Sequence, residues 1–261
     1  MNLDQIREHW RRAGEELLLS ERVTPTSRDP FLGQLEEAFI IRYLGKDDRV
    51  LEVGCGDAKH TLEYARHVNF IWGVDVADSL IDLARQQSAT AGTENVEFAV
   101  GSILDLDKVI GDQQLDCVIS QRCLINLPTW EYQREALMRI HGVLKPDGLF
   151  LMTEGFQDEL EELNRLREQV GLSTINVVDY NRNFRHVEFD DFINQHFSVE
   201  AIHDYGHYLF LSRVYHPLAV FPEQPKHDSP LNQAASLLST LVPASDFKHF
   251  SYNLCYVLRK K

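Results

Sequence analysis

The chain has 261 residues, of which 44% are hydrophobic and 25% charged, and its formal net charge is -14. This is the composition of a globular protein large enough to bury its own core, and the negative charge argues against a protein that tracks nucleic-acid phosphates. The four cysteines form no Cys-x-x-Cys pair, no apolar run has membrane-spanning length, and the N-terminus lacks the apolar core of a signal peptide. We therefore expect a cytoplasmic protein with reduced thiols and no membrane partner.

Two helices are predicted at the start of the chain. Leu3, Ile6, Trp10 and Leu17 have helical spacing, the polar stretch TPTSRDP interrupts the pattern, and FLGQLEEAFIIRYL continues it as a second helix. We expect residues 1–45 to form a helical lid.

The middle of the chain alternates short apolar runs with helical stretches. The apolar runs lie at 49–53, 70–74, 96–100, 115–119 and 148–152, and the helical stretches lie near 58–67, 78–90 and 130–144. Continuous apolar strands separated by helices are typical of a parallel sheet covered on both faces. The pattern predicts a doubly wound α/β fold whose core occupies residues 46–155.

Beyond Glu154 the pattern is looser. A charged helix at 156–170 leads to an irregular aromatic segment, and a strand in FSVEAIHDYG follows. The rest of the chain predicts a helix in HYLFLSRVYHPLAVF, a helix near 231–241 and a closing strand in FSYNLCYVL. We expect residues 156–261 to interleave late sheet strands with a substrate-binding cap.

A nucleotide-binding turn is predicted at VLEVGCGDAKHT, residues 50–61. Gly54 and Gly56 match the first two glycines of the dinucleotide fingerprint, but Lys59 stands in place of the third. Glu52 would repel a pyrophosphate and tolerates the sulfonium and ammonium groups of S-adenosylmethionine. Asp75 ends the next apolar run, where a carboxylate accepts hydrogen bonds from ribose hydroxyls. These residues favour S-adenosylmethionine and disfavour the alternative, an NAD-linked dehydrogenase.

Segments of the chain resemble, in the expected order, the class I S-adenosylmethionine-dependent methyltransferases. They are LEVGCGDAKHT, GVDVADSLIDLAR, VEFAVGSILDL and the stretch from LDCVISQRCLINLP to LKPDGLFLMTEG, and together they cover about residues 50–155. The resemblance implies a mostly parallel, seven-stranded Rossmann-like sheet whose last strand, SYNLCYVL, is antiparallel. It also implies that S-adenosyl-L-methionine binds over the carboxyl ends of the first four strands.

The resemblance further implies a set of cofactor-binding residues. Asp75 takes the ribose, Val76 packs against adenine, and Ser102 and Ile103 bracket the adenine ring. Glu52, Gly54 and Gly56 shape the methionine end of the cofactor, Ser120 and Gln121 line the methionine or methyl side, and Cys55 is a further cofactor-binding residue. The sequence departs from the family pattern at Ala58, where a third glycine is usual, and at Ser102, where an acid often holds the adenine amino group.

Residues outside the cofactor turn are candidates for binding the methyl acceptor and for catalysis. Glu154, at the end of the fifth strand, and His207, where the cap begins, are the candidate catalytic groups. The candidate substrate-binding side chains are Arg122, Tyr180, Arg182, Tyr208 and Arg213. If the arginines converged with Arg28, they would form a bidentate clamp for an anion.

The acceptor is expected to be a small molecule or a carbohydrate. The region after residue 155 resembles the small-molecule and glycan-tailoring branches of the family. The segment SQRCLI replaces the Asn/Asp-Pro-Pro-aromatic run of the nucleic-acid amino methyltransferases, and no Pro-Cys nucleophile is present. Oxygen methylation is the leading hypothesis, and N-methylation of an amine and non-catalytic cofactor binding are the alternatives. No metal site is indicated, and homo-oligomerisation is left open.

Overall fold

A computed structural model describes residues 1–19, 29–242 and 247–261. Its core is one seven-stranded sheet with the order β3-β2-β1-β4-β5-β7-β6. The strands are β1 (Arg49–Val53), β2 (Phe70–Asp75), β3 (Val96–Val100), β4 (Leu115–Gln121), β5 (Leu144–Gly155), β6 (Phe197–Asp204) and β7 (Asn253–Lys260). Strands β1 to β5 pair in parallel, and β7 is antiparallel to both of its neighbours. The predicted fold class and the antiparallel last strand are confirmed.

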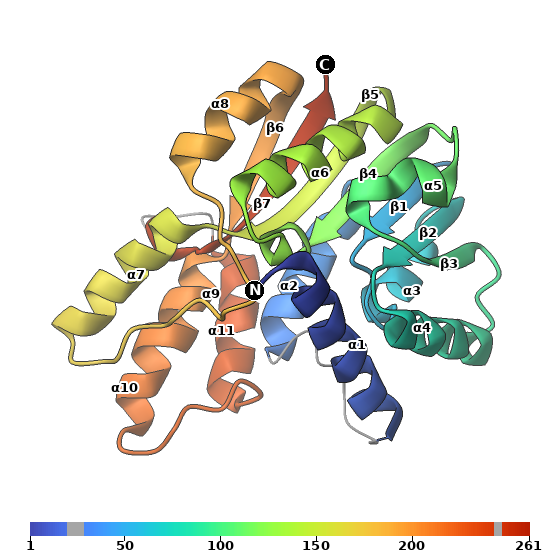
Figure 1. Ribbon diagram of the computed structural model, residues 1–261. Coiled ribbons are helices and arrows are strands. Elements are labelled where there is room, and N and C mark those ends of the chain that lie inside the picture. Colours follow the sequence, from blue (N-terminus) through green and yellow to red (C-terminus); the bar gives the residue numbers. More distant parts are fainter. Residues whose placement is uncertain (20–28, 243–246) are drawn as a thin grey trace.

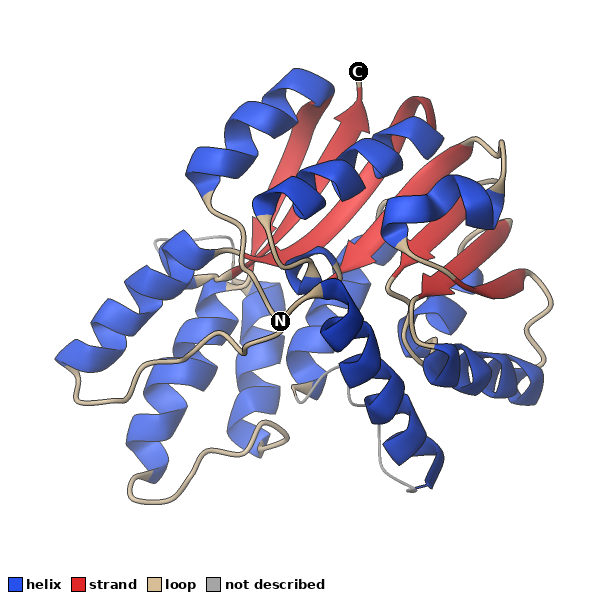
Figure 2. Ribbon diagram, in the orientation of Figure 1, coloured by secondary structure: helices blue, strands red, loops and turns tan. Residues whose placement is uncertain are grey.

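Helices cover both faces of the sheet (Figures 1 and 2). One face packs against α5 (Leu106–Ile110), α6 (Trp130–Val143) and α8 (His186–His196). The other packs against α2 (Pro30–Ile41), α3 (Lys59–Ala65), α4 (Asp78–Ala91), α9 (Gly206–Phe210) and α11 (Pro230–Leu241). The remaining helices are α1 (Leu3–Leu19), α7 (Gln157–Gln169) and α10 (His216–Val220). Short 3-10 turns lie at Ile103–Asp105, Leu124–Asn126 and Lys248–Phe250, and a π turn at Leu211–Tyr215 joins α9 to α10.

The continuous apolar strands are explained by burial on two sides. Successive residues of a strand point to opposite faces. Val50 therefore belongs to the core cluster beneath α2 and α3, and Leu51 belongs to the cluster beneath α5 and α6. In β4, Val118 and Ile119 divide between the two clusters in the same way. A strand buried on both faces has no polar alternation, which is the pattern that the sequence showed.

The last part of the chain contains one helix that the sequence did not predict. Helix α8 lies within the segment expected to be irregular. Phe189 and Ile193, four residues apart, are buried on its inner side, whereas Val187 is exposed. This single buried pair is too short a pattern to stand out among the aromatic residues around it. The strand in FSVEAIHDYG is confirmed as β6, and the helical HYLFLSRVYHPLAVF as α9 through α10.

Helix α1 packs along α4, at the carboxyl-end side of the sheet (Figure 1). A Cβ on Gly14 would lie 2.3 Å from Oγ of Ser79, so glycine permits the close approach of the two helices. The same Ser79 hydroxyl donates a hydrogen bond to the carbonyl of Arg11 over 2.7 Å.

The division of the chain at residues 45 and 155 stays a prediction.

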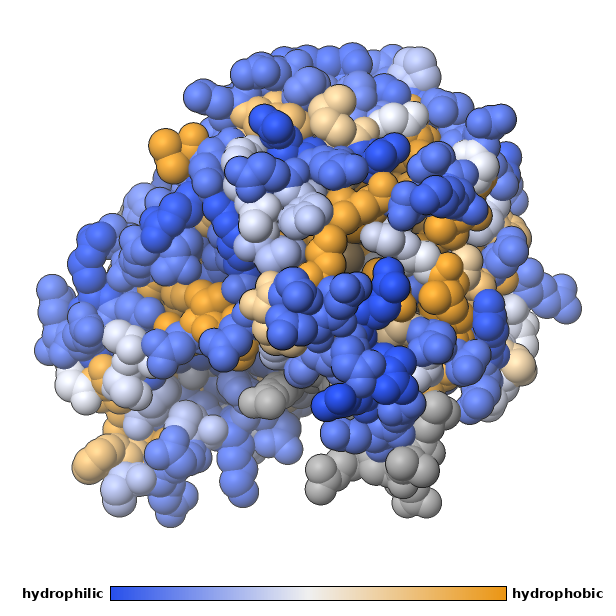
Figure 3. Space-filling model, in the orientation of Figure 1, coloured by the Kyte–Doolittle hydropathy of each residue, from blue (hydrophilic) through white to orange (hydrophobic). Residues whose placement is uncertain are grey.

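The face of the molecule in Figure 3 is mainly hydrophilic, and its apolar side chains lie in narrow strips between helices. Among residues 1–19, 29–242 and 247–261, no helix is both long enough and apolar enough to cross a membrane.

Candidate functional site

The turn between β1 and α3 contains three residues with a left-handed backbone. Gly54, Gly56 and Ala58 are all left-handed, with φ of 71°, 56° and 66°. A Cβ on Gly54 would lie 2.6 Å from the side chain of Cys123, so only glycine fits there. The left-handed conformation costs an alanine about 1–2 kcal/mol because its Cβ crowds the next carbonyl. The departure from the family pattern at Ala58 therefore keeps the turn but strains it.

Asp75 ties this turn to the end of β2. One carboxylate oxygen accepts a hydrogen bond from the Gly56 amide over 3.0 Å, and the other accepts one from the Ala77 amide over 2.9 Å. Burial raises the pKa of Asp75, and these backbone donors partly offset the rise. A carboxylate has about four lone-pair positions, so two remain for a ligand. Asp75 thus shapes the turn and presents acceptors to the cavity beside it.

Glu52 is a second buried acid at this turn. Its side chain accepts a hydrogen bond from the Thr61 hydroxyl over 2.5 Å. Burial raises the pKa of Glu52 to about 7, because desolvation penalises the ionised carboxylate. A cation bound nearby would favour the ionised form, so the site suits a positively charged ligand.

A cavity with an empty volume of about 1230 Å³, including the part open to solvent, lies over this turn. The sequence-predicted residues that line it are Glu52, Gly54, Cys55, Gly56, Asp75, Val76, Ser102, Ile103, Gln121 and Arg122. The lining includes the carboxylates of Glu52, Asp57 and Asp75 as well as the apolar side chains of Val76, Leu80 and Ile103. An adenosine with a cationic sulfur fits a lining that contains both carboxylates and apolar side chains.

Ser102 lines the cavity but has a local role as well. Its Oγ accepts a hydrogen bond from the Leu104 amide over 3.2 Å and caps the short turn that follows. The hydroxyl can still donate a hydrogen bond, because capping uses only its acceptor capacity.

Helix α1 supplies a wall that no single sequence motif indicated. Leu3, Ile6, Arg7 and Trp10 line the cavity. The sequence predicted a lid over residues 1–45 but gave no reason to select these four side chains. Their helical spacing predicts that one side of the helix is buried. It does not indicate which part of the protein that side contacts.

Glu154 and Ser120 lie behind the cavity wall, which corrects the expectation that they face the site. Glu154 is fully buried, and it accepts hydrogen bonds from the Ser120 hydroxyl and from the amides of Cys123, Leu124 and Ile125. Burial raises the pKa of Glu154 to about 7. Its carboxylate therefore holds the loop after β4 in place, and the structure does not bring it to a ligand.

The cap residues predicted for catalysis and substrate binding also lie outside the cavity lining. The His207 ring lies 5.2 Å from that of Phe247. The Tyr208 hydroxyl donates to Asp29 over 2.6 Å, and Arg213 pairs with the same carboxylate. The side chains of Tyr208 and Arg213 are thus occupied in fastening the cap to the start of α2. The expectation that these residues reach the site is not supported by their positions.

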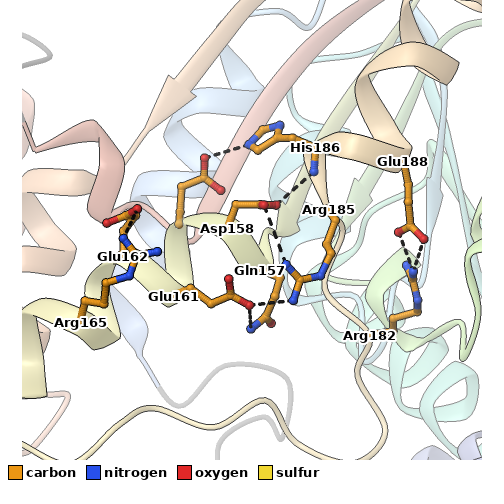
Figure 4. Close-up of polar contacts among 10 residues, drawn as sticks. Gln157, Asp158, Glu161, Glu162, Arg165, Arg182, Arg185, His186 and Glu188 are labelled. Atoms are coloured by element: carbon orange, nitrogen blue, oxygen red, sulfur yellow. Dashed lines mark hydrogen bonds and ion pairs between the residues drawn. The ribbon is translucent and has the colours of Figure 1, made fainter.

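Tyr180 and Arg182 lie next to the cavity rather than in its wall. The Tyr180 ring stacks on His9 of α1 at 4.3 Å between centroids. Arg182 makes two hydrogen bonds to the carboxylate of Glu188, at 2.8 and 2.6 Å, which Figure 4 shows. It also donates to Gln133 over 2.6 Å.

The predicted anion clamp does not form among the described arginines. Arg122 lines the cavity and lies 3.2 Å from the fully buried Glu36, and Arg182 and Arg213 pair with other carboxylates in separate places. Arg28 lies outside the described residues. Arg122 also has a left-handed backbone, with φ of 52°. Strain of this kind at a cavity wall persists only where the surroundings enforce it.

Asp158, Glu159 and His186 place possible ligand atoms within 4.8 Å of one another, at the junction of α7 and α8. Figure 4 shows the salt bridges around them. His186 pairs with Glu159 over 2.8 Å and with Asp190 over 3.2 Å, and Arg185 lies 3.9 Å from Asp158. The Glu159 carboxylate raises the pKa of His186 to about 9, so the imidazole is protonated near neutral pH. We interpret the cluster as a structural ion-pair network.

His60 is a cavity residue that the sequence analysis did not select. It lies in the first turn of α3, its side chain is 14% exposed, and its Nδ1 lies 2.8 Å from Oε2 of Glu37. The glycine turn predicted at residues 50–61 includes this histidine, but its partner lies 23 residues earlier in a different helix. Only the tertiary structure shows the pair.

A known protein family matches most of this chain. The sequence matches the family described as the methyltransferase domain over residues 44–205, which is more than half of the chain. The chain belongs to this family, and its fold is that of the class I S-adenosylmethionine-dependent methyltransferases. The predicted resemblance to the class I methyltransferases is confirmed, and so is the cofactor that such a domain implies, S-adenosylmethionine.

The similar proteins include the uncharacterized methyltransferase YcgJ of Bacillus subtilis, which is 28% identical over 129 residues, 47% of this chain and 49% of that protein. The chain thus spans about half the length of this curated relative. The crystal structure of YcgJ matches with a TM-score of 0.53 at 19% identity, over 87% of this chain and 96% of that one.

Two further structures match over nearly the whole chain. Magnesium protoporphyrin IX methyltransferase from Synechocystis, with bound S-adenosylhomocysteine, has a TM-score of 0.62 at 12% identity and covers 99% of both chains. The N-methyltransferase NodS from Bradyrhizobium japonicum, also with S-adenosylhomocysteine, has a TM-score of 0.57 at 12% identity, over 96% of this chain and 98% of that one. At these identities the likeness concerns the fold alone.

Proposed function

We propose that this protein transfers the methyl group of S-adenosylmethionine to a hydroxyl group of a small molecule or sugar. The observation that carries the proposal is a single cavity lined both by the acids Glu52 and Asp75 and by the apolar side chains of Val76 and Ile103. Glu52 suits the cationic end of the cofactor and Asp75 its ribose. The sulfonium supplies an activated methyl group, so the protein's own task is to orient the acceptor and exclude water.

The helix that contributes to the wall of the site favours a small acceptor. Helix α1 lies over the cavity, and Ile6 and Trp10 form part of its wall. The net charge of -14 and the pairing of Arg122 with Glu36 argue against a polyanionic substrate. Alignment inside such a cavity can supply about 7–11 kcal/mol of the barrier reduction, so transfer does not depend on a strong base.

Oxygen is favoured over nitrogen by the charges of the lining. Glu52, Asp57 and Asp75 line the cavity, and nearby carboxylates favour the protonated form of an aliphatic amine. A protonated amine has no lone pair with which to attack, whereas a hydroxyl keeps its lone pairs. N-methylation of an amine is the second candidate, because the N-methyltransferase NodS shares the fold.

Methyl-labelled S-adenosylmethionine tests the proposal with phenols, sugars and primary amines as acceptors. We expect label in a hydroxyl-bearing product together with release of S-adenosylhomocysteine. Label only in amines would favour the second candidate. Tight cofactor binding with no transfer to any acceptor class would identify a binding protein instead of an enzyme.

We also propose a cytoplasmic location. The proposal is supported by Cys55, Cys117, Cys123 and Cys255, all of which are free thiols. Homo-oligomerisation stays a prediction, which light scattering of the purified protein would test.

A further inference from the structure

A histidine–carboxylate pair stands at the edge of the cavity where α3 begins. His60 lies two residues after the strained Ala58 and lines the cavity, and Glu37 reaches it from α2. The exposed fractions of their side chains are 14% and 24%, so solvent reaches neither one freely. The pair joins the glycine turn to a helix outside the nucleotide-binding part of the chain.

The hydrogen bond fixes which ring nitrogen faces the carboxylate. Oε2 of Glu37 lies 2.8 Å from Nδ1 of His60, and an ionised carboxylate can only accept, so Nδ1 carries the proton. The opposite nitrogen, Nε2, makes no hydrogen bond or ion pair to any part of the chain that the structure describes. The ring also lies nearly parallel to that of Tyr64, at 23° and 6.3 Å between centroids. The imidazole is therefore oriented by the hydrogen bond at Nδ1, and Nε2 is available for a ligand.

The charges around the cavity indicate what that nitrogen meets. The cationic or basic side chains in the lining are Arg7, Lys59, His60 and Arg122. Arg122 is paired with the buried Glu36, and Arg7 also lines the neighbouring hollow with Val76 and Ser102, at the adenine side. Lys59 and His60 are thus the basic side chains next to the glycine turn, where the amino-acid end of the cofactor is expected. That end carries a carboxylate, which the acids Glu52 and Asp57 would repel.

We propose that His60, oriented by Glu37, binds the carboxylate of the cofactor's amino-acid end. The inference rests on the proposed function, because it takes the cavity to be the S-adenosylmethionine site. In the complex the imidazole lies between two carboxylates, each of which only accepts hydrogen bonds, so each ring nitrogen serves as a donor. The other titratable groups that face the ring are Glu52 of β1, Asp57 of the turn and Tyr64 of α3 itself.

Two ligands that differ only in the amino-acid end separate this role from others. S-adenosylhomocysteine carries the carboxylate, and 5′-methylthioadenosine has the same adenosine and thioether without it. By calorimetry we expect His60→Gln to weaken S-adenosylhomocysteine binding about 10- to 100-fold, the value of one charge-assisted hydrogen bond, and to change methylthioadenosine binding less than about twofold. Glu37→Gln should weaken S-adenosylhomocysteine binding by a smaller factor, since its amide oxygen can still accept from Nδ1. His67→Gln, at a histidine that pairs with Glu63 outside the cavity lining, is the control.

Circular dichroism of each variant checks that α3 is intact.

Each other outcome overturns the inference. Equal weakening of both ligands would mean that the substitution deforms the turn. Unchanged binding of S-adenosylhomocysteine would mean that the carboxylate lies elsewhere, and if methyl transfer were lost in that variant, His60 would act on the methyl acceptor instead. If the wild type bound neither ligand, the proposed function itself would fail. If the wild type bound both ligands and His60→Gln bound them equally well, only the inference about His60 would fail.

Discussion

The indole Nε1 of Trp10 donates a hydrogen bond to Oδ1 of Asn126 over 2.6 Å, and the two residues are 116 positions apart in the sequence. Both side chains line the cavity. The bond fastens α1 to the loop after β4, and it therefore joins the predicted lid to the part of the sheet edge where the methyl acceptor is expected.

Loosening this bond is expected to speed the release of the cofactor product. Trp10→Phe keeps an apolar ring in the wall but removes the N–H donor, and Asn126→Ala removes the acceptor. One hydrogen bond of about 1 kcal/mol corresponds to roughly fivefold faster dissociation of S-adenosylhomocysteine, measured by stopped-flow. The double variant should be no faster than the faster of the single ones, because both break the same bond. Arg12→Ala, on the exposed side of α1, is the control, and a wild-type rate in both single variants would contradict the lid.

Asp75→Asn should weaken S-adenosylhomocysteine binding at least tenfold by calorimetry. The amide keeps the shape of the side chain and one acceptor, but it loses the negative charge that strengthens hydrogen bonds from ribose hydroxyls by about 1.5–3 kcal/mol each. Asp116→Asn, at an acid near the start of β4 that pairs with Lys145, should leave binding unchanged. Undiminished affinity in Asp75→Asn would remove the basis for the nucleotide site.

Glu154 makes the stability of the protein depend on pH. Burial raises its pKa from 4.5 to about 7, so the folded state holds a proton that the unfolded state has released. The resulting stabilisation is complete below about pH 4.5 and is lost as the pH rises through 7; the difference in pKa corresponds to on the order of 3 kcal/mol.

Urea unfolding between pH 5 and pH 8 measures this contribution. Glu154→Gln, which cannot ionise, should flatten the fall in the free energy of unfolding over that interval. Glu52, whose pKa is also raised to about 7, contributes a slope of the same sign that stays in this variant. The same pH dependence in wild type and variant would show that Glu154 stays ionised when folded.

Arg122 is expected to contribute to stability in two separable ways. Arg122→Ala leaves the fully buried Glu36 without its cationic partner, 3.2 Å away, and breaking a buried pair costs about 3–5 kcal/mol. Since Arg122 is 23% exposed in its side chain, we expect the lower end of that range. Arg122→Gly removes the same side chain but fits the φ of 52°, so it should be more stable than Arg122→Ala by about 1–2 kcal/mol.

The same variants test a contact with the methyl acceptor. Arg122 lines the cavity, so we expect a higher KM for the acceptor in both variants, with S-adenosylhomocysteine affinity unchanged. Wild-type KM and kcat in a folded Arg122→Gly protein would show that this guanidinium acts only on Glu36.

The cofactor half of the site was predictable because its signals are local. Gly54 and Gly56 are needed where the backbone is left-handed, and Asp75 is recognisable because it stands at the end of an apolar run. Parallel strands bring their carboxyl ends to one edge of the sheet, so acids at two strand ends are neighbours whatever the loops do. Glu52 and Asp75 accordingly line one cavity, as predicted.

Glu154 shows why the acceptor half was not predictable. It also ends a strand, yet its carboxylate turns to the amides of residues 123–125 instead of the cavity. Side-chain direction at a strand end depends on which donors the neighbouring loop offers, and those donors are fixed by packing. The sequence cannot supply that information.

The sequence by itself determined the order of the strands and of most helices, the glycine turn and the two acids beside it, because steric limits on the backbone and the period of burial are encoded within a few residues. Tertiary structure alone decided that Trp10 meets Asn126, that Glu37 orients His60, and that each described arginine predicted to form the clamp is paired with a carboxylate of its own. These contacts join segments distant in the chain, and their geometry depends on how whole helices pack against the sheet.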